Sequence, residues 1–290
     1  LLERMAKGGD LSGIPGLYLR GSGLQGARVF EKDLDRFPLP EVSLLSFCTP
    51  EQKGSWIPLQ TRRGCPMGCS YCSTALIEGR SIRMRRPESI VEEMACFVAA
   101  GFERFYMVDN IFNIPQGYAK ALCRKISERR LPISWRCILH PGKVDTELIH
   151  LMAKAGCTEV SLGFESGCER ILRGMHKGFV PDDVRRASAT LQESGIRRMG
   201  FLLLGGPGET KESVLESLAF AESLNLDLLK ITVGIRVYPD TDLAQRAVAD
   251  GLLQPEDDLL FPRFYSVPGL GDWLHETVRR WMADRPHWMF

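Results

Sequence analysis

Short apolar stretches alternate with longer segments of mixed polarity along most of the chain after residue 55. The short stretches are rich in β-branched and aromatic residues, which is typical of strands. Strands that alternate with helices indicate βα units and a parallel sheet. The predicted strands are 56–60, 104–109, 133–139, 159–165, 199–205 and 229–238.

Between these strands, apolar residues recur at three- and four-residue spacing, which predicts helices with one buried face. Pro87 stands at a favourable first helical position. Gly101, Gly156, Gly195 and Gly251 follow four of these segments, where a left-handed residue often ends a helix. The predicted helices are 87–100, 116–128, 145–155, 181–194, 211–223 and 242–250, with another near 271–282.

Six parallel βα units are too few to close an eight-stranded barrel. We therefore predict an α/β fold in which residues 55–251 form an open partial (β/α)6 barrel with parallel strands. The functional site of such a fold is expected at the carboxyl ends of the strands, where the loops converge. Residues 1–54, rich in Pro and Gly, predict a linker, and the aromatic residues 252–290 predict an extension that packs on the barrel or covers its mouth.

The composition is that of an ordinary globular protein, because 44% of the 290 residues are hydrophobic and 25% are charged. A net charge of +1 provides no general attraction for nucleic acid or for an anionic membrane, so we expect neither as a partner. The sequence shows no apolar run near the roughly 20 residues that cross a bilayer and no secretion signal, which favours a cytoplasmic location.

Nine cysteines are an odd number, and most of them are scattered without a disulfide-like framework. This pattern suits a reducing compartment, and it predicts buried structural thiols rather than a second metal cluster. The scattered cysteines are Cys48, Cys96, Cys123, Cys137, Cys157 and Cys168.

The other three cysteines, Cys65, Cys69 and Cys72, lie in one short loop with the spacing C-x3-C-x2-C. Iron–sulfur electron carriers usually use four cysteines and structural zinc uses four closed ligands, so three thiolates leave one metal position open for a small molecule. Two alternatives need a fourth ligand. One is a zinc site completed by His140 or another distant residue, and the other is a non-catalytic iron–sulfur electron-transfer module.

The cysteine loop and the segment 78–94 that follows it resemble the radical S-adenosylmethionine superfamily. The resemblance covers roughly residues 51–241 and is closest to the branch whose members carry an N-terminal cobalamin-binding domain. Further matching motifs are Val108-Asp-Asn110, Gly163-Phe-Glu-Ser-Gly167, Gly205-Gly-Pro-Gly-Glu-Thr210 and Arg236-Val-Tyr-Pro-Asp-Thr241.

The resemblance implies a [4Fe-4S] cluster on Cys65, Cys69 and Cys72, with S-adenosylmethionine on the unique iron. One-electron reduction, by an external donor such as flavodoxin or ferredoxin, would cleave this cofactor to methionine and a 5'-deoxyadenosyl radical. The chain begins at Leu1 rather than Met. We expect residues 1–54 to include the remnant of a truncated cobalamin-binding domain, with cobalamin bound by the full-length protein.

Several polar residues at predicted strand ends match positions that bind S-adenosylmethionine in the superfamily. Tyr71 matches the aromatic residue near adenine, with ordinary loop packing as the alternative. Asp109 and Asn110 match groups that hold the amino end of the cofactor, and Asp109 has the alternative of capping a turn. Glu165 offers an acceptor for ribose hydroxyls or the amino group, and Ser166 with the following glycine lets the backbone approach closely.

Two further strand ends complete the predicted cofactor site. Gly205 and Gly206 remove side chains where adenine would contact the backbone, and a phosphate loop is excluded because the Lys-Ser/Thr ending is absent. Arg236 is expected to point inward and bind a carboxylate, with a solvated strand-end arginine as the alternative. The basic run Arg80, Arg83, Arg85 and Arg86 is expected to be a solvated connector.

The motifs together predict a radical S-adenosylmethionine enzyme, either an oxidoreductase or a methyltransferase, that acts on a small-molecule or peptide substrate. Within the superfamily we expect a cobalamin-dependent methyltransferase or a related rearrangement enzyme. The alternatives are a methylthiotransferase and a coproporphyrinogen-type dehydrogenase. The absence of a second cysteine triplet from the sequence argues against the methylthiotransferase.

Overall fold

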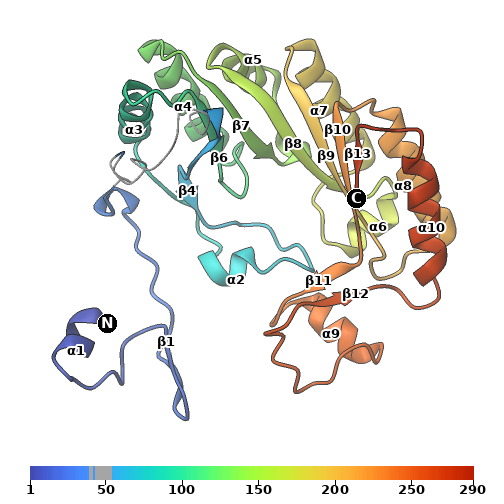
Figure 1. Ribbon diagram of the computed structural model, residues 1–290, viewed down its shortest axis with the longest axis horizontal. Helices are drawn as coiled ribbons and strands as arrows, with labels where there is room; N and C mark the ends of the chain where they lie inside the picture. Colours follow the sequence, from blue (N-terminus) through green and yellow to red (C-terminus); the bar gives the residue numbers. More distant parts are fainter. Residues whose placement is uncertain (39–41, 43–53) are drawn as a thin grey trace.

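The computed structural model describes residues 1–38, 42 and 54–290, and in this part the predicted open parallel barrel is confirmed (Figure 1). A seven-stranded sheet has the order β13-β10-β9-β8-β7-β6-β3, and every neighbouring pair is parallel. The strands are β3 (Ile57–Leu59), β6 (Arg104–Met107), β7 (Ser134–Leu139), β8 (Cys157–Glu165), β9 (Arg197–Leu204), β10 (Leu228–Val233) and β13 (Trp288–Met289).

Helices cover one face of this sheet, and most of them agree with the predicted segments within one or two residues (Figure 1). They are α3 (Pro87–Ala99), α4 (Gln116–Arg129), α5 (Thr146–Lys154), α7 (Pro181–Glu193), α8 (Lys211–Ser223) and α10 (Gly271–Met282). Helix α9 (Asp242–Ala249) lies apart from this layer, beyond the carboxyl ends of the strands. Three short helices were not predicted, namely α1 (Leu2–Ala6), α2 (Thr74–Glu78) and α6 (Glu169–Gly174).

The last predicted strand, 229–238, is wrong as a single element because the chain turns at Gly234, which has φ +81°. The N–H of Gly234 donates to Leu204 O at 2.8 Å, and the following β11 (Ile235–Val237) pairs antiparallel with β12 (Arg263–Tyr265) outside the main sheet. The two-residue strand β13, which extends the sheet beyond the six predicted strands, is too short to show any alternation in the sequence.

Two smaller antiparallel pairs lie before α3. One joins β1 (Leu17–Leu19) to β2 (Gly23–Gln25), and the other joins β4 (Arg62–Arg63) to β5 (Arg83–Met84). The second pair matters for the site, because β4 leads directly into the cysteine loop and β5 carries the chain from α2 to α3.

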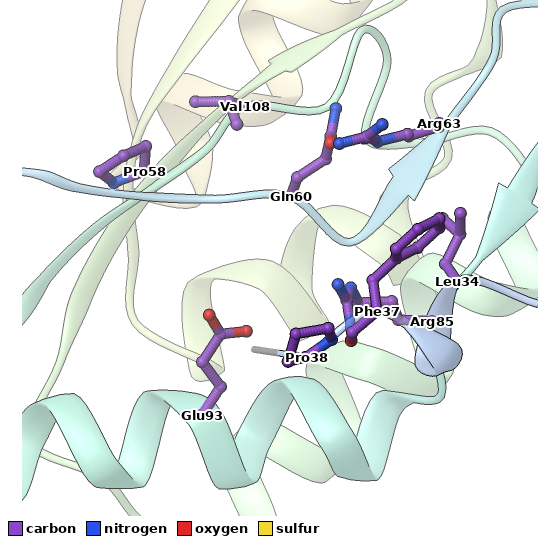
Figure 2. A pocket seen from close by; sticks show the side chains of 9 residues that line it. All are labelled: Leu34, Phe37, Pro38, Pro58, Gln60, Arg63, Arg85, Glu93 and Val108. Carbon is purple, nitrogen blue, oxygen red and sulfur yellow. The ribbon is translucent and has the colours of Figure 1, made fainter. Parts of the chain in front are cut away.

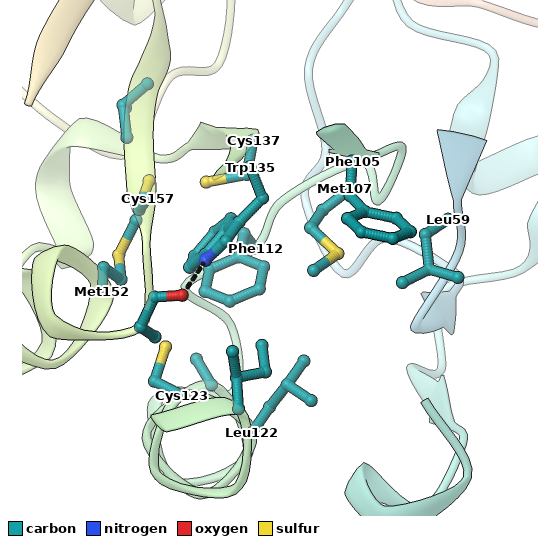
Figure 3. Close-up of a cluster of buried hydrophobic side chains, with 14 of the residues drawn as sticks. Leu59, Phe105, Met107, Phe112, Leu122, Cys123, Trp135, Cys137, Met152 and Cys157 are labelled. Atoms are coloured by element: carbon teal, nitrogen blue, oxygen red, sulfur yellow. Dashed lines mark hydrogen bonds between the residues drawn. The ribbon is translucent and has the colours of Figure 1, made fainter. Parts of the chain in front are cut away.

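The larger core fills the space between the first strands of the sheet and helices α3 to α5 (Figure 3). Trp135 on β7 is fully buried in it, and its indole Nε1 donates to Ala155 O at 2.8 Å, so its polar atom is satisfied. Cys123, Cys137 and Cys157 are buried free thiols in this cluster, and burial raises the pKa of Cys123 and Cys137. Inert structural thiols are expected to have such surroundings.

The other scattered cysteines differ from one another. Cys168 is buried as predicted, Cys96 is exposed, and Cys48 lies outside the described residues. Helix α10 buries Leu274 and Val278 in a second core that also contains residues of β9, β10 and α8. No helix in the described ranges combines the length and the apolar composition that a membrane crossing requires.

Gly156 and Gly195 offer a matched test of this packing. Each glycine follows a helix, and each has a positive φ. A Cβ on Gly156 would lie 2.6 Å from Ile133 O, whereas a Cβ on Gly195 would meet nothing within 4 Å. We expect Gly195→Ala to lower the free energy of unfolding by about 1 kcal/mol through backbone strain alone, and Gly156→Ala to lower it by at least about 1 kcal/mol more. Urea denaturation measures both values, and equal losses would contradict the close approach of Gly156 to the Ile133 carbonyl.

Candidate functional site

The three predicted metal ligands lie together in the loop between β4 and α2, with Cys65 buried and Cys69 and Cys72 partly buried. The backbone of the loop is tied to three other parts of the chain. Cys65 N donates to Gly79 O at 3.0 Å, Ser70 N donates to Met175 O at 3.1 Å, and Leu243 N donates to Ser70 O at 2.9 Å. Figure 1 shows α2, α6, β11 and α9 on the same side of the sheet, where the carboxyl ends of the strands lie.

Gly64 and Asn110 fix the start of this loop. Gly64 has φ +94°, and a Cβ there would lie 2.2 Å from Ser81 O, so only glycine fits. Its N–H donates to Glu78 Oε2 at 2.9 Å, and the same oxygen accepts from Asn110 Nδ2 at 2.7 Å. The Asn110 amide thus holds the cysteine loop through Glu78, and its predicted contact with the amino end of the cofactor stays a prediction.

Asp109 is also a structural residue. It is fully buried, and its carboxylate accepts hydrogen bonds from Thr61 N at 2.7 Å, from Arg62 N and Nε at 3.1 Å each, and from the Thr61 hydroxyl. The Arg62 guanidinium lies 5.0 Å from the Phe112 ring centroid and 4.6 Å from that of Tyr118. Both oxygens of the Asp109 carboxylate are therefore bound by Thr61 and Arg62, which are distant in sequence, rather than by its own turn. Its predicted contact with the amino end of the cofactor stays a prediction.

Glu165, at the end of β8, has an unusual backbone. Its φ of 62° is rare for a residue with a side chain, and the register between β8 and β9 shifts between Gly163 and Glu165. A Cβ on Gly163 would lie 3.1 Å from Glu165 Oε1, so the glycine leaves room for the carboxylate. Backbone strain of this kind is often found at functional sites. The backbone of Glu165 thus marks it as a candidate site residue independently of the motif.

Glu165 contacts Tyr71 from the cysteine loop and a residue that the sequence analysis missed, Lys177. Glu165 Oε1 accepts from Tyr71 Oη at 3.0 Å and from Lys177 Nζ at 3.2 Å, and Lys177 Nζ lies 5.2 Å from the Tyr71 ring centroid. The side chain of Lys177 is only 9% exposed. Burial opposes its charge, but the Glu165 carboxylate, with further contributions from Tyr71 and Cys69, outweighs this effect and raises the pKa of Lys177, so it stays protonated.

Glu209 organises the glycine-rich turn after β9. Its Oε2 accepts from the N–H groups of Gly205 and of Gly206, the latter at 2.9 Å, and Gly205 O accepts from Val267 N at 2.8 Å. Both backbone polar groups of Gly205 are therefore used within the protein. The edge-on hydrogen bonding to adenine expected of Gly205 and Gly206 stays a prediction. Apolar side chains of the chain itself lie beside the turn, since a Cβ on Gly206 would lie 3.0 Å from Ile235 Cδ1.

Two other predicted residues have structural positions. Ser166 is fully buried; its hydroxyl lies 2.8 Å from the Ser217 hydroxyl and accepts from Cys168 N at 3.1 Å. The glycine after it packs on α8, because a Cβ on Gly167 would lie 2.3 Å from Phe220 Cβ. Arg236 is exposed on β11, with its guanidinium 4.9 Å from the Tyr238 ring centroid. The close cofactor approach expected at Ser166 stays a prediction, and the exposure of Arg236 favours the alternative of a solvated strand-end arginine over an inward guanidinium.

The donor set of the loop fits an iron–sulfur cluster. All three sulfurs are free thiols, and the pKa of Cys65 and of Cys69 is raised, first by burial and also by the neighbouring thiols, so an added cationic centre would stabilise their thiolates. Among the described residues, no three His, Cys, Asp or Glu side chains converge on a single ion. A cubane cluster does not require such convergence, because each thiolate binds a different iron.

His140, the suggested fourth zinc ligand, is buried at the end of β7. Its ring packs edge-on against Phe179 with centroids 5.2 Å apart, and burial together with Lys177 and Lys143 lowers its pKa to about 4. The Nδ1 atom has no partner among the described residues. The structure shows no contact between His140 and the cysteine loop.

A separate cavity of about 540 Å³ lies at the β3 edge of the sheet (Figure 2). None of the three loop cysteines lines it. Glu93 of α3 projects into it, and burial raises the pKa of this carboxyl to about 7. Pro38, the last described residue before position 42, forms part of the wall, and we assign this cavity no ligand.

The chain thus combines an open parallel barrel with a three-cysteine loop at the carboxyl ends of its strands. This arrangement is typical of enzymes that hold a metal cluster with one open position. The family model of the radical SAM superfamily matches residues 59–221. The chain belongs to this superfamily.

Relatives and solved structures agree with that assignment. The chain is 29% identical to an uncharacterized methyltransferase of Pyrococcus horikoshii, over 87% of this chain and 56% of the relative. It is 25% identical to cytidylyl-2-hydroxyethylphosphonate methyltransferase of Streptomyces wedmorensis, over 83% and 49%. The chain thus spans about half the length of these curated relatives.

Among solved structures, the fold matches the radical S-adenosylmethionine methyltransferase TsrM of Kitasatospora setae, determined with cobalamin and a [4Fe-4S] cluster bound. The TM-score is 0.83 at 23% identity, covering 99% of this chain and 67% of TsrM. The open partial barrel predicted for residues 55–251 therefore agrees with the fold of TsrM.

The buried pair of Asp109 and Arg62 gives a test of the structural role of Asp109. Asp109→Asn leaves the Arg62 charge without its partner, so we expect a loss of about 3 kcal/mol in the free energy of unfolding. Asp145→Asn, which weakens a half-buried helix cap and its contact with Lys120, is expected to lose about 1 kcal/mol or less. Urea denaturation of the two variants measures both losses in the free energy of unfolding. Wild-type stability in Asp109→Asn, combined with lost S-adenosylmethionine binding, would contradict the structural role.

Glu209 predicts a pH dependence. Burial raises its pKa to about 7 from an ordinary value of 4.5, although the N–H groups of Gly205 and Gly206 oppose the rise. Because the folded state binds this proton more tightly than the unfolded state, the stabilisation is complete below pH 4.5 and is lost as the pH rises to about 7.

The free energy of unfolding of the wild type, relative to Glu209→Gln, is therefore expected to fall by about 3 kcal/mol across this range. Urea denaturation at several pH values measures the difference. The control is Glu92→Gln, which changes an exposed residue of α3. If the difference in the free energy of unfolding between the wild type and Glu209→Gln does not vary with pH, the pKa of Glu209 is ordinary and the prediction is wrong.

Proposed function

We propose that this chain is the catalytic core of a cobalamin-dependent radical S-adenosylmethionine methyltransferase or of a related rearrangement enzyme. The observation that carries the proposal is the three-sulfur loop beside the buried group of Glu165, Lys177 and Tyr71. The methyltransferase activities of the named relatives support methyl transfer, and the TsrM structure supports the presence of a [4Fe-4S] cluster, S-adenosylmethionine and cobalamin in the whole protein.

Cys65, Cys69 and Cys72 would hold the cluster as thiolates, leaving one iron free for the amino and carboxylate groups of S-adenosylmethionine. When bound and reduced by one electron, the cluster supplies the reductive cleavage of the sulfonium to methionine and a 5'-deoxyadenosyl radical. The ties from Cys65 to Gly79 and from Ser70 to Met175 and Leu243 keep the loop in one position. A fixed loop is what a labile cluster needs.

The paired charges beside the loop suit a zwitterionic cofactor. Lys177 is a partly buried donor for a carboxylate, and Glu165 is a partly buried acceptor for an ammonium group or a ribose hydroxyl. The two groups bind each other at 3.2 Å, which stabilises both charges. Tyr71 donates to Glu165 and keeps its carboxylate in place.

The turn at Gly205 and Gly206 supplies an apolar wall next to this group. Ile235 Cδ1 and Met175 Cε both lie close to the position that a Gly206 side chain would occupy, at 3.0 and 3.1 Å. Such a wall suits the flat adenine ring by packing, while the Glu209 carboxylate keeps the turn rigid. We propose a small-molecule substrate, which fits the small molecules after which the methyltransferase relatives are named, and an external protein as the electron donor.

The experiment is anaerobic reconstitution followed by product analysis with dithionite as the reductant. We expect a four-iron cluster and release of 5'-deoxyadenosine, with S-adenosylhomocysteine appearing as well when the methyl transfer operates. Cys69→Ala is expected to lower nucleoside release at least about 100-fold, because two thiolates cannot retain the cubane. Cys96→Ala, which changes an exposed cysteine of α3, is the matched control and should behave as wild type.

Two results would contradict the proposal. One is a fully loaded cluster that leaves S-adenosylmethionine intact after reduction. The other is a Cys69→Ala variant with normal iron content and normal release of 5'-deoxyadenosine. Accumulation of S-adenosylhomocysteine without 5'-deoxyadenosine would retain a methyltransferase but remove the radical step.

A further inference from the structure

The strands of the main sheet have two faces of different character. On one face, residues such as Trp135 and Cys137 of β7 are buried in the core under the helices. The residues between them point to the opposite face, which the helices leave open (Figure 1). Ile138, Met199 and Phe201 of this open face are half-buried, and they belong to none of the cores formed by the described residues. A sheet face of this kind is typical of a binding surface.

Near the amino ends of the strands, the open face carries a row of polar residues. Tyr106, Arg136, Glu159 and Arg197 occupy neighbouring register positions on β6, β7, β8 and β9, so they share this face. Arg136 Nη1 lies 3.4 Å from Glu159 Oε1, and Arg197 Nη1 lies 3.7 Å from Glu159 Oε2. One carboxylate thus serves two guanidinium groups, and the row keeps a net positive charge.

Arg136 is held in place without using all of its hydrogen-bond donors. Its guanidinium lies 4.5 Å from the Trp56 ring centroid and 4.7 Å from that of Tyr106. Its Nε is buried and has no hydrogen-bond partner among the described residues. The contact with Glu159, at 3.4 Å, is longer than the roughly 2.7–2.9 Å of a strong charged hydrogen bond. A fixed guanidinium with donors to spare suits the planar binding of an oxyanion.

Between this row and the cysteine loop, the open face is apolar or small. Ile138, Ser161 and Met199 form the next row in register, and Gly163 and Phe201 are paired beyond it. The face then reaches Glu165, which contacts Tyr71 of the cysteine loop. Glu159 and Glu165 are six residues apart on β8, so the two ends of the face are separated by about 20 Å.

We propose that this open face binds the substrate, and that Arg136 binds a carboxylate or phosphate at the end of the substrate remote from its reacting carbon. The inference rests on the proposed function and gives the chemical class of the substrate, an elongated molecule with an apolar body and an anionic end. The other cations of the face, Arg104, Arg197 and Lys230, are exposed and therefore solvated. Arg136 is the cation that two aromatic rings enclose.

The continuity of the face selects the substrate as its occupant. A molecule that lies along the face from Arg136 ends beside Glu165 and Lys177, the residues proposed to hold the cofactor. Charge complementarity selects an anion for the other end, because Glu159 alone balances two arginines. The separation of about 20 Å selects an elongated molecule, since a single amino acid or sugar is too short to reach both ends.

The test is calorimetric titration of the reconstituted, oxidised chain with decanoate, decyl phosphate and uncharged decanol. S-adenosylmethionine is present throughout to occupy the proposed cofactor pocket. Arg136→Met removes the charge and keeps much of the apolar stem, and Arg136→Lys keeps the charge without the planar fork. The matched control is Arg197→Met, which removes a cation that contacts the same carboxylate but whose side chain is 59% exposed.

We expect Arg136→Met to bind the tighter of the two anions at least about 10-fold more weakly and to bind decanol as the wild type does. Arg136→Lys is expected to lose about 3-fold for that anion, because a point charge replaces the fork. Arg197→Met should change the affinity for each probe by less than about 2-fold. Phe201→Ala is expected to weaken all three probes alike, since it removes only apolar contact. The tighter anion identifies the group as a carboxylate or a phosphate.

Several results would overturn the proposal. They are wild-type binding of both anions no tighter than that of decanol, equal losses for anion and decanol in Arg136→Met, and a loss in Arg197→Met as large as in Arg136→Met. If Arg136→Met does not fold, unchanged anion binding in Arg136→Lys contradicts the role of Arg136. A second copy of the chain that covers the face in sedimentation experiments would also contradict it. Failure of dithionite to release 5'-deoxyadenosine counts against the proposed function instead, and the titrations still decide whether Arg136 binds the anion.

Discussion

The buried ion pair of Arg62 and Asp109 is the constraint on which the site depends. Arg62 precedes the cysteine loop by two residues, and Asp109 follows β6, the neighbour of β3 in the sheet. Both side chains are almost completely removed from water, so each charge needs the other, and removal of either one leaves an uncompensated buried charge. The pair therefore ties the start of an irregular loop to the carboxyl end of β6. The backbone bonds from Cys65 and Ser70 then fix the rest of the loop relative to the strand ends.

A second feature is the division of labour among buried carboxylates at the carboxyl edge of the sheet. Asp109 and Glu209 bind backbone N–H groups and hold the cysteine loop and the glycine-rich turn in place. Glu165 is different, because its partners are side chains, Lys177 and Tyr71, that can exchange it for a ligand. The acceptors bound to backbone build the walls of the proposed site, and the acceptor bound to side chains, Glu165, is the one proposed to face the ligand. This distinction separates structural from ligand-binding acids more clearly than the motifs do.

Much of the fold could be predicted from the sequence, because each helix from α3 to α10, apart from the short α6, shows an apolar face, and each long strand has a run of β-branched and aromatic residues. The fourth and fifth strands end within one residue of the predicted ends. The sixth ends earlier than predicted, because the chain turns at Gly234. The site was predicted less fully. The cysteines and Glu165 stand in recognisable motifs, but Lys177 lies in a loop with no pattern around it, and only folding brings it to Glu165. For Asp109, Asn110, Ser166 and Gly205, the sequence indicates polar or glycine residues at strand ends but not that the protein itself uses their hydrogen bonds.

The central claim is that three sulfur ligands leave one iron of the cluster open to S-adenosylmethionine. Mössbauer spectroscopy of the chain reconstituted with 57Fe tests this claim most directly. Addition of S-adenosylmethionine should shift the signal of about a quarter of the iron, as one site of a four-iron cluster gains nitrogen and oxygen ligands. A spectrum that does not change on addition, or a loop that binds zinc with a protein side chain as its fourth ligand, would contradict the account.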